Sequence, residues 1–250
     1  MTAGNGRSID RGDYVKFHIT SQVWGQKRNV STYGKGMAPQ VLKLGSPSTP
    51  PVLLKAVTGK ATGSRVLVTD EAEHAFGKQM PPGVKKTDVA VFVIDLLESV
   101  SVDKNITNRG KELPPPANFP KIKDATGSDP EVEFPDKYIP SSTLEHATVV
   151  QGSGPEVKSG QTLIAQSLGV ALSKRHKFQN TWDADEPGLY PLGSGMLIKG
   201  WERALVGKRV GDRVVFSVPA DMAYGENPPP NSGIEKNESL LFVVEILGAV

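Results

Sequence analysis

The sequence predicts an α+β fold in which several antiparallel strands pack over one short helix, and it predicts this unit twice along the chain. Three features lead to this prediction. Several segments have the apolar period of strands, one short segment has the period of a helix, and two parts of the chain repeat each other.

The internal repeat relates residues 52–68 to residues 200–216 at a constant separation of 148 residues. Residues 88–100 recur as residues 238–250 at a separation of 150, so the second copy has a slightly longer loop. The matching turn positions are Gly59 with Gly207, Gly63 with Gly211, and Phe76-Gly77 with Tyr224-Gly225. One structural unit is therefore used twice.

Three segments of the second copy have strand character. They are QTLIAQSLGV (161–170), RVVFSV (213–218) and LLFVVEIL (240–247). Alternation in RVVFSV predicts that one face carries Val214, Phe216 and Val218. LLFVVEIL is apolar on both faces, which is typical of a strand that is covered on both sides.

The predicted helix lies between the Leu-Gly turn at 192–193 and Gly207. On it, Ile198, Trp201 and Leu205 recur at i, i+3 and i+7, so they line one face. Gly207 suits the C′ position that ends a helix, because glycine tolerates the left-handed conformation.

A proline-rich stretch, KELPPPANFP (111–120), predicts the domain boundary, because it favours extended backbone and cannot continue a helix. We predict a first domain over 1–100, a linker over 101–118 and a second domain over 119–250. The first copy has far fewer residues before its Gly12 than the second has before Gly160. The first domain is therefore expected either to be N-terminally truncated or to begin late.

Composition argues against several classes of function. The net charge of +2 lacks the basic excess of nucleic-acid-binding proteins, and the absence of cysteine excludes disulfides and cysteine-ligated zinc. The four histidines lack the spacing of metal ligands, and no apolar run approaches the roughly 20 residues that span a bilayer. We expect no metal, no cofactor, no nucleic-acid partner and no transmembrane segment.

The second copy carries an ordered set of motifs: a Leu-Gly turn, Ile-x-Gly-Trp, Gly-Lys-x-Val-Gly, Ala-Tyr-Gly and then a strand with Phe. With this order and spacing, residues 119–250 resemble an FKBP-type peptidyl-prolyl isomerase domain. The resemblance is strong over about residues 140–250 and weaker over 12–100, where it rests mostly on the repeat. It implies, for each domain, a curved antiparallel sheet wrapped around one short helix.

The resemblance also implies a proline-binding pocket in the C-terminal domain. Trp201 matches the pocket floor, Tyr224 a tyrosine whose hydroxyl bonds the ligand, and Ile198 a residue whose backbone N–H donates to it. The residues expected in catalysis are Tyr224, Trp201, Phe178, Ile198 and Phe242. The residues expected to bind substrate are Leu197, Ile234, Gln179, Ser167 and Tyr190.

Such a pocket suits proline isomerisation. Rotation about an X-Pro bond breaks amide resonance against a barrier of about 20 kcal/mol. An apolar pocket favours the twisted amide, which has less charge separation than the planar one. Catalysis is then preferential binding of the twisted state, without a nucleophile or a metal.

Three positions of the second copy depart from the family pattern. Ser167 stands where a tyrosine is expected, Gln179 stands where an aspartate follows the pocket phenylalanine, and Gly188 replaces an aromatic residue. Because the tyrosine and the aspartate line and polarise the pocket, these changes are expected to lower activity without destroying the proline site.

The first copy departs further. The tryptophan position falls on Leu53, the isoleucine position on Pro50 and the tyrosine position on Phe76. We expect this domain to keep the fold and to have lost catalysis.

The expected partners are X-Pro segments of polypeptides, and the resemblance implies macrolide inhibitors such as tacrolimus and rapamycin. The main function expected is an isomerase that assists folding. One alternative is a chaperone or peptide-binding module with little or no turnover, and another is a structural envelope protein whose pocket binds nothing. The form NPPPNSGIEKNESLLFVVEIL (227–247) resembles variants common in actinobacterial exported proteins. Together with the tandem arrangement, it leads us to expect an extracytoplasmic or cell-envelope location with the leader removed; the alternative is cytoplasmic.

Overall fold

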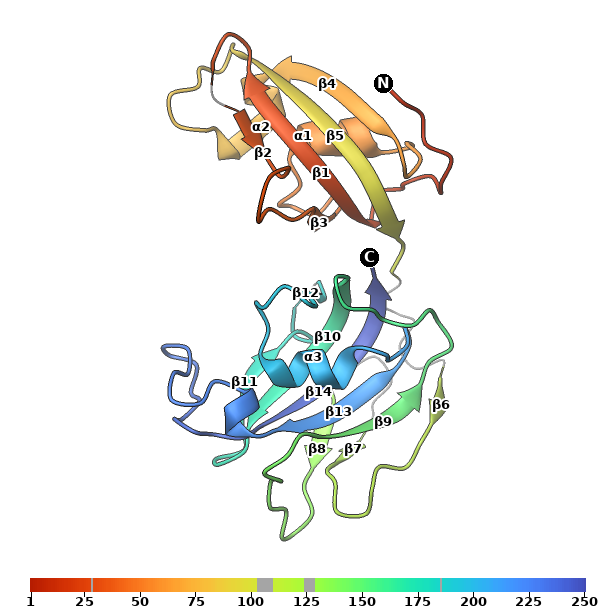
Figure 1. Cartoon of the computed structure of the whole chain (residues 1–250), viewed down its shortest axis with the longest axis vertical. Coiled ribbons are helices and arrows are strands. Elements are labelled where there is room, and N and C mark those ends of the chain that lie inside the picture. The colour runs from red at the N-terminus through yellow and green to blue at the C-terminus, as the bar shows by residue number, and fades with distance from the viewer. Residues whose placement is uncertain (28, 103–109, 124–128, 185) are drawn as a thin grey trace. The chain divides into compact units, whose positions relative to one another are not determined.

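The computed structural model describes residues 1–250 except 28, 103–109, 124–128 and 185. The chain divides into two compact units, Met1–Val102 and Asp103–Ala249, each with its own sheet (Figure 1). The α+β class and the antiparallel pairing are as predicted. Among the described residues, no helix has both the length and the apolar character needed to cross a bilayer.

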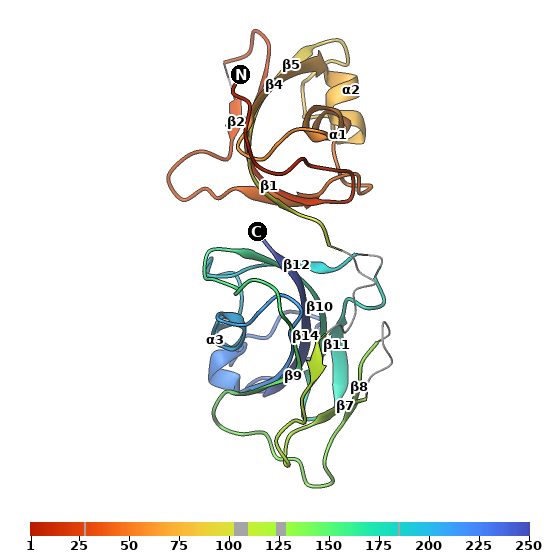
Figure 2. The same cartoon turned by 90° about the vertical axis from the view of Figure 1, so that its right-hand side faces the viewer.

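The N-terminal unit has a five-stranded antiparallel sheet with the order β2-β1-β5-β4, and β3 also pairs with β1. Its elements are β1 (Tyr14–Val23), β2 (Asn29–Ser31), β3 (Gln40–Lys43), α1 (Pro51–Val57), β4 (Arg65–Glu71), α2 (Ala72–Phe76), η1 (Gly77–Gln79) and β5 (Val89–Val100). Both helices lie on the same side of the sheet (Figure 2). Helix α2 was not predicted, because its five residues are too few to show a helical period.

The C-terminal unit has a seven-stranded sheet with the order β11-β10-β14-β13-β9-β6, and β12 also pairs with β10. Its elements are β6 (Lys111–Glu112), β7 (Lys121–Lys123), β8 (Glu131–Glu133), β9 (Glu145–Gln151), β10 (Thr162–Ala171), β11 (His176–Asn180), β12 (Gly188–Pro191), α3 (Lys199–Leu205), β13 (Arg213–Val218), η2 (Ala220–Met222) and β14 (Leu240–Ala249).

The repeat predicted from the sequence is confirmed in the elements. Helices α1 and α3 begin at Pro51 and Lys199, and strands β1 and β10 begin at Tyr14 and Thr162, so both pairs keep the separation of 148 residues. The turn after each helix is also the same, because Gly59 and Gly207 have φ of 74° and 86°. Gly207 occupies the predicted C′ position behind the C-cap residue Val206.

The C-terminal sheet is buried on both faces. On the inner face, α3 packs against a core that contains Val214, Phe216 and Val218, as the alternation predicted. On the outer face, Phe119 and residues of the β7–β8 hairpin pack over β10, β13 and β14. Strand β14 contributes residues to both of these clusters, so it is covered on both faces, which explains why both are apolar.

The predicted linker, 101–118, falls partly on 103–109, outside the described residues. From Lys111 onward the chain lies against the C-terminal sheet, because β6 pairs with β9 and the backbone N–H of Leu113 donates to the Val149 carbonyl at 2.9 Å. The proline-rich stretch therefore leads into the segment that covers the outer face of this sheet.

Candidate functional site

The centre of the candidate site is Trp201, which α3 directs into the inner core. Trp201 is 3% exposed, and its ring meets Phe242 edge-on at a centroid distance of 5.4 Å. Phe178 meets Phe242 edge-on in turn, at 5.7 Å. Such edge-to-face pairs are favoured by the aromatic quadrupole, so they hold the three rings in defined orientations.

The other apolar residues predicted for the site gather around these rings. Ile234 belongs to the inner core and is 9% exposed. Leu197, Ile198, Tyr190 and Tyr224 are half-buried and pack against the same core. The structure therefore brings together residues that the sequence distributes over β11, β12, α3, β14 and two loops.

Two groups at this site are free to bond a ligand. In the described part of the chain, no group accepts a hydrogen bond from the backbone N–H of Ile198, which immediately precedes α3. The hydroxyl of Tyr224 likewise has no hydrogen-bond partner among the described residues, and burial raises its pKa, so it is a neutral donor at physiological pH.

A surface cavity of about 580 Å3 adjoins the aromatic cluster. Leu197, Ile198 and Ala223 form its apolar wall, and Glu202 and Asp221 contribute carboxylates. Because Leu197 and Ile198 also pack against the inner core, these two residues separate the aromatic cluster from the cavity.

The polar residues of the site form one group, which was not predicted. The Gln179 Nε2 donates to the Ser167 Oγ at 2.6 Å and to the Tyr190 hydroxyl at 3.0 Å. The Ser167 and Tyr190 hydroxyl oxygens are 2.5 Å apart. The Tyr190 ring also packs on Trp201 with a centroid distance of 4.4 Å.

The three departures from the family pattern are linked through this group. Ser167 and Gln179 are both bonded to Tyr190. Gly188 leaves room for the Tyr190 ring, because a Cβ at position 188 would lie 2.5 Å from the ring carbon Cζ. The sequence contains one sign of this arrangement, which is a glycine two residues before a tyrosine on a strand. It does not show in which direction the tyrosine ring extends.

The N-terminal unit lacks the polar groups at equivalent positions. Pro50 has no backbone N–H to match that of Ile198, and Phe76 has no hydroxyl to match that of Tyr224. Leu53 replaces the tryptophan and lies in the core, 5% exposed. A cavity of about 550 Å3 is nevertheless present there, lined in part by Val30, Phe76 and Val84.

Both units of the chain match a known protein family. The model of the family described as "FKBP-type peptidyl-prolyl cis-trans isomerase" matches the chain twice, at residues 5–97 and 154–247. A protein named FK506-binding protein from Streptomyces anulatus is 34% identical over 118 residues, which cover 47% of this chain and 94% of the relative. A peptidyl-prolyl cis-trans isomerase from Arabidopsis thaliana is 31% identical over 107 residues, 42% of this chain and 96% of the relative.

Among solved structures, the crystal structure of AtFKBP13 superposes with a TM-score of 0.40 and 25% sequence identity. The match covers 45% of this chain and 97% of the other.

Proposed function

The chain belongs to the FKBP-type peptidyl-prolyl cis-trans isomerase family, with two domains of that family in tandem, and we propose that its isomerase activity resides in the C-terminal domain. The observation that supports this most is a difference between the two domains. The C-terminal site combines Trp201 with the free Ile198 N–H and the free Tyr224 hydroxyl, whereas the N-terminal site has none of the three.

In this proposal the proline ring of an X-Pro segment lies against the aromatic cluster formed by Trp201, Phe178 and Phe242. The Ile198 N–H and the Tyr224 hydroxyl hold carbonyl oxygens of the segment, which keeps its ends in place while the X-Pro amide rotates. The apolar walls exclude water and favour the less polar twisted amide. The substrates are exposed X-Pro segments of polypeptides, and the role is assistance to folding.

The same pocket is proposed to bind macrolides of the tacrolimus class. Relatives such as the one from Streptomyces anulatus are named FK506-binding proteins. The aromatic floor and walls of this chain offer the same kind of apolar surface, so such a ligand should change the fluorescence of Trp201.

A protease-coupled isomerisation assay on a short X-Pro peptide tests the proposal. Trp201→Leu installs the residue that the N-terminal domain carries at the equivalent position, and it should lower kcat/KM by roughly 100-fold, as the loss of about 2–3 kcal/mol of apolar and aromatic contact implies. The matched control, Leu53→Met, should leave turnover unchanged. No acceleration by the intact, folded chain would refute the isomerase assignment.

A second candidate function is peptide binding without turnover in the N-terminal domain. The cavity beside Phe76 favours it, because Val23, Val30, Pro81, Pro82 and Val84 give that cavity a largely apolar lining. A Phe76→Asp variant should then lose binding of an unfolded polypeptide while keeping full isomerase turnover on a short peptide. Unchanged binding of the unfolded polypeptide would exclude this function.

A further inference from the structure

We infer that Tyr190 supplies the tyrosine hydroxyl that position 167 lacks, and that this hydroxyl donates a hydrogen bond to a backbone carbonyl of the bound X-Pro segment. The inference rests on the proposed isomerase site and adds to it a residue that determines how the substrate is held.

Strand register explains how Tyr190 reaches position 167. On β10, Leu163, Ala165 and Ser167 alternate onto one face of the sheet. On β12, Tyr190 pairs with Leu163 and Gly188 pairs with Ala165. The ring of Tyr190 must therefore extend along the strands, over Gly188 and Ala165, to bring its hydroxyl to Ser167.

The small residues on this route are necessary. At Gly188 any Cβ would collide with the Tyr190 ring, as the 2.5 Å approach to Cζ shows. Ser167 is itself fully buried, and its short side chain leaves the space beyond it for the arriving hydroxyl. Together, these residues replace the tyrosine of the family pattern at position 167. Ser167 and Gly188 provide the space, and Tyr190 provides the hydroxyl.

Counting hydrogens assigns the direction of each hydrogen bond. Gln179 uses two N–H donors, one for each hydroxyl oxygen. The two hydroxyls share one further hydrogen bond, which uses the hydrogen of one of them. One hydroxyl hydrogen is therefore left over within the group.

That remaining hydrogen belongs to Tyr190. Ser167 is 0% exposed, so a spare hydrogen on its Oγ would be a buried donor without an acceptor, which is costly. Tyr190 is half-buried and its ring packs on Trp201, so a spare hydrogen on its hydroxyl is not confined to the interior as one on Ser167 would be. If Ser167 donates to Tyr190, the Tyr190 O–H points away from the group and can bond a substrate carbonyl.

The consequence is a change in the kind of ligand group that Ser167, Gln179 and Tyr190 recognise. The aspartate of the family pattern would be a charged acceptor at position 179, whereas Gln179, Ser167 and Tyr190 together present a neutral donor. Acceptors on the ligand, such as peptide carbonyls, are therefore favoured over ligand hydroxyls.

Steady-state isomerisation of an X-Pro peptide by the intact chain and two variants tests this inference. Tyr190→Phe keeps the ring on Trp201 and removes the donor. Gln179→Glu is nearly isosteric and replaces two donors by acceptors that capture both hydroxyl hydrogens. Each variant should raise KM about tenfold, with kcat changed less than about threefold, because the hydrogen bond is made equally before and during rotation.

The matched control is Tyr33→Phe, which removes a hydroxyl bonded to Asp95 in the N-terminal domain and should leave KM unchanged. Near-UV circular dichroism, to which Trp201 contributes, checks that the packing of the aromatic rings survives in Tyr190→Phe. An unchanged KM in Tyr190→Phe, or a lower KM in Gln179→Glu, would overturn the inference.

The outcome remains separable from that of the proposed function. If the intact chain shows no turnover, the isomerase proposal fails, and the same variants are compared by binding of the X-Pro peptide, followed through Trp201 fluorescence. About tenfold weaker binding by Tyr190→Phe would then support the role of Tyr190. Equal binding, or no binding by any form, would refute it.

Discussion

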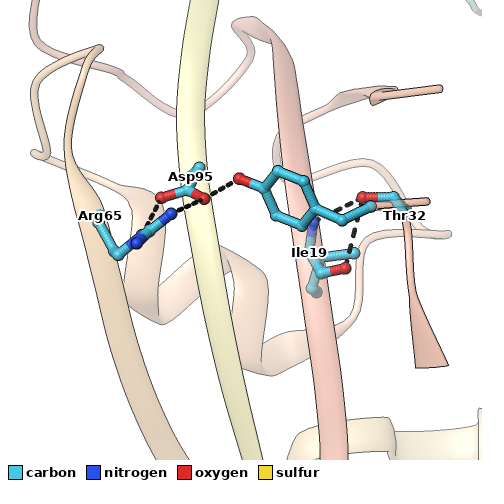
Figure 3. Close-up of polar contacts among 5 residues, drawn as sticks. Ile19, Thr32, Arg65 and Asp95 are labelled. Carbon is cyan, nitrogen blue, oxygen red and sulfur yellow. Dashed lines mark hydrogen bonds and ion pairs between the residues drawn. The ribbon is translucent and has the colours of Figure 1, made fainter. Parts of the chain in front are cut away.

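The two domains carry the same cross-strand ion pair in opposite surroundings. Arg65 on β4 pairs with Asp95 on β5 in the N-terminal domain (Figure 3), and Arg213 on β13 pairs with Glu245 on β14 in the C-terminal domain. The side chains are 57% and 14% exposed in the first pair but 1% and 4% exposed in the second.

The difference comes from what lies on the outer face of each sheet. In the C-terminal domain, the segment that includes Phe119, Ile122 and Phe134 packs on this face. In the N-terminal domain, the outer face keeps exposed residues such as Leu67 and Leu97, and the Tyr33 hydroxyl bonds Asp95 there. The fold thus tolerates large changes on the outer face of the sheet, outside the inner core.

The largest expected effect is on stability at these ion pairs. Arg213→Met leaves Glu245 buried without its partner and should lower the free energy of unfolding of the C-terminal domain by about 3–5 kcal/mol. Arg65→Met should cost the N-terminal domain less than about 1 kcal/mol, because its pair is exposed. Native-state hydrogen exchange of β14 and β5 amides reports on each sheet separately. Equal losses would contradict the comparison.

A smaller effect is expected from the tyrosine hydroxyl that distinguishes the two sites. Tyr224→Phe copies Phe76 and should lower kcat/KM about tenfold, the cost of one hydrogen bond to the substrate. The reverse change, Phe76→Tyr, should add no activity, because Pro50 still provides no N–H and Leu53 no aromatic floor. A protease-coupled assay measures both, and a gain of activity from Phe76→Tyr would show that the N-terminal site lacks only the hydroxyl.

The smallest effect concerns alkaline pH. Burial raises the pKa of Tyr190 above its ordinary value of 10.0, and the hydrogen bonds with Ser167 and Gln179 oppose this in part. A raised folded-state pKa of an acid means that its contribution to stability is present below pH 10 and is lost as the pH rises through the folded value. Leu42 stands at the equivalent position of the N-terminal domain, so that domain has no counterpart of the Tyr190 titration.

The alkaline effect is measured by urea unfolding at pH 9 and pH 11, followed through tryptophan fluorescence in a Trp24→Phe background, because Trp182 and Trp201 both lie in the C-terminal domain. The intact chain should lose more stability between these values than Tyr190→Phe does. An equal loss in both would show that the pKa of Tyr190 is not higher in the folded state than in the unfolded state.

Much of the inner architecture could be predicted because it is encoded locally. The period of Ile198, Trp201 and Leu205 and the stop at Gly207 predicted α3, and the alternation in 213–218 predicted which face of β13 is buried. Because the first domain repeats this sequence, the same helix and strand were predicted there.

The remaining features depend on contacts between distant residues. The proline-rich stretch has no periodicity that would show that it leads onto the outer face of the C-terminal sheet. Considered one at a time, the departures at Ser167, Gln179 and Gly188 each remove a side chain that the family pattern places in the pocket. Only the pairing of β10 with β12 shows that Tyr190 links them.

An NMR titration of the isotope-labelled intact chain with an X-Pro peptide tests the central claim most directly, because one sample reports both the binding site and the exchange between cis and trans peptide. We predict that the Ile198 amide shifts as the peptide saturates, that the peptide exchanges faster, and that amides near Phe76 do not follow the same curve. Accelerated exchange with an unmoved Ile198 amide, or with shifts confined to the N-terminal domain, would contradict the assignment of catalysis to the C-terminal site.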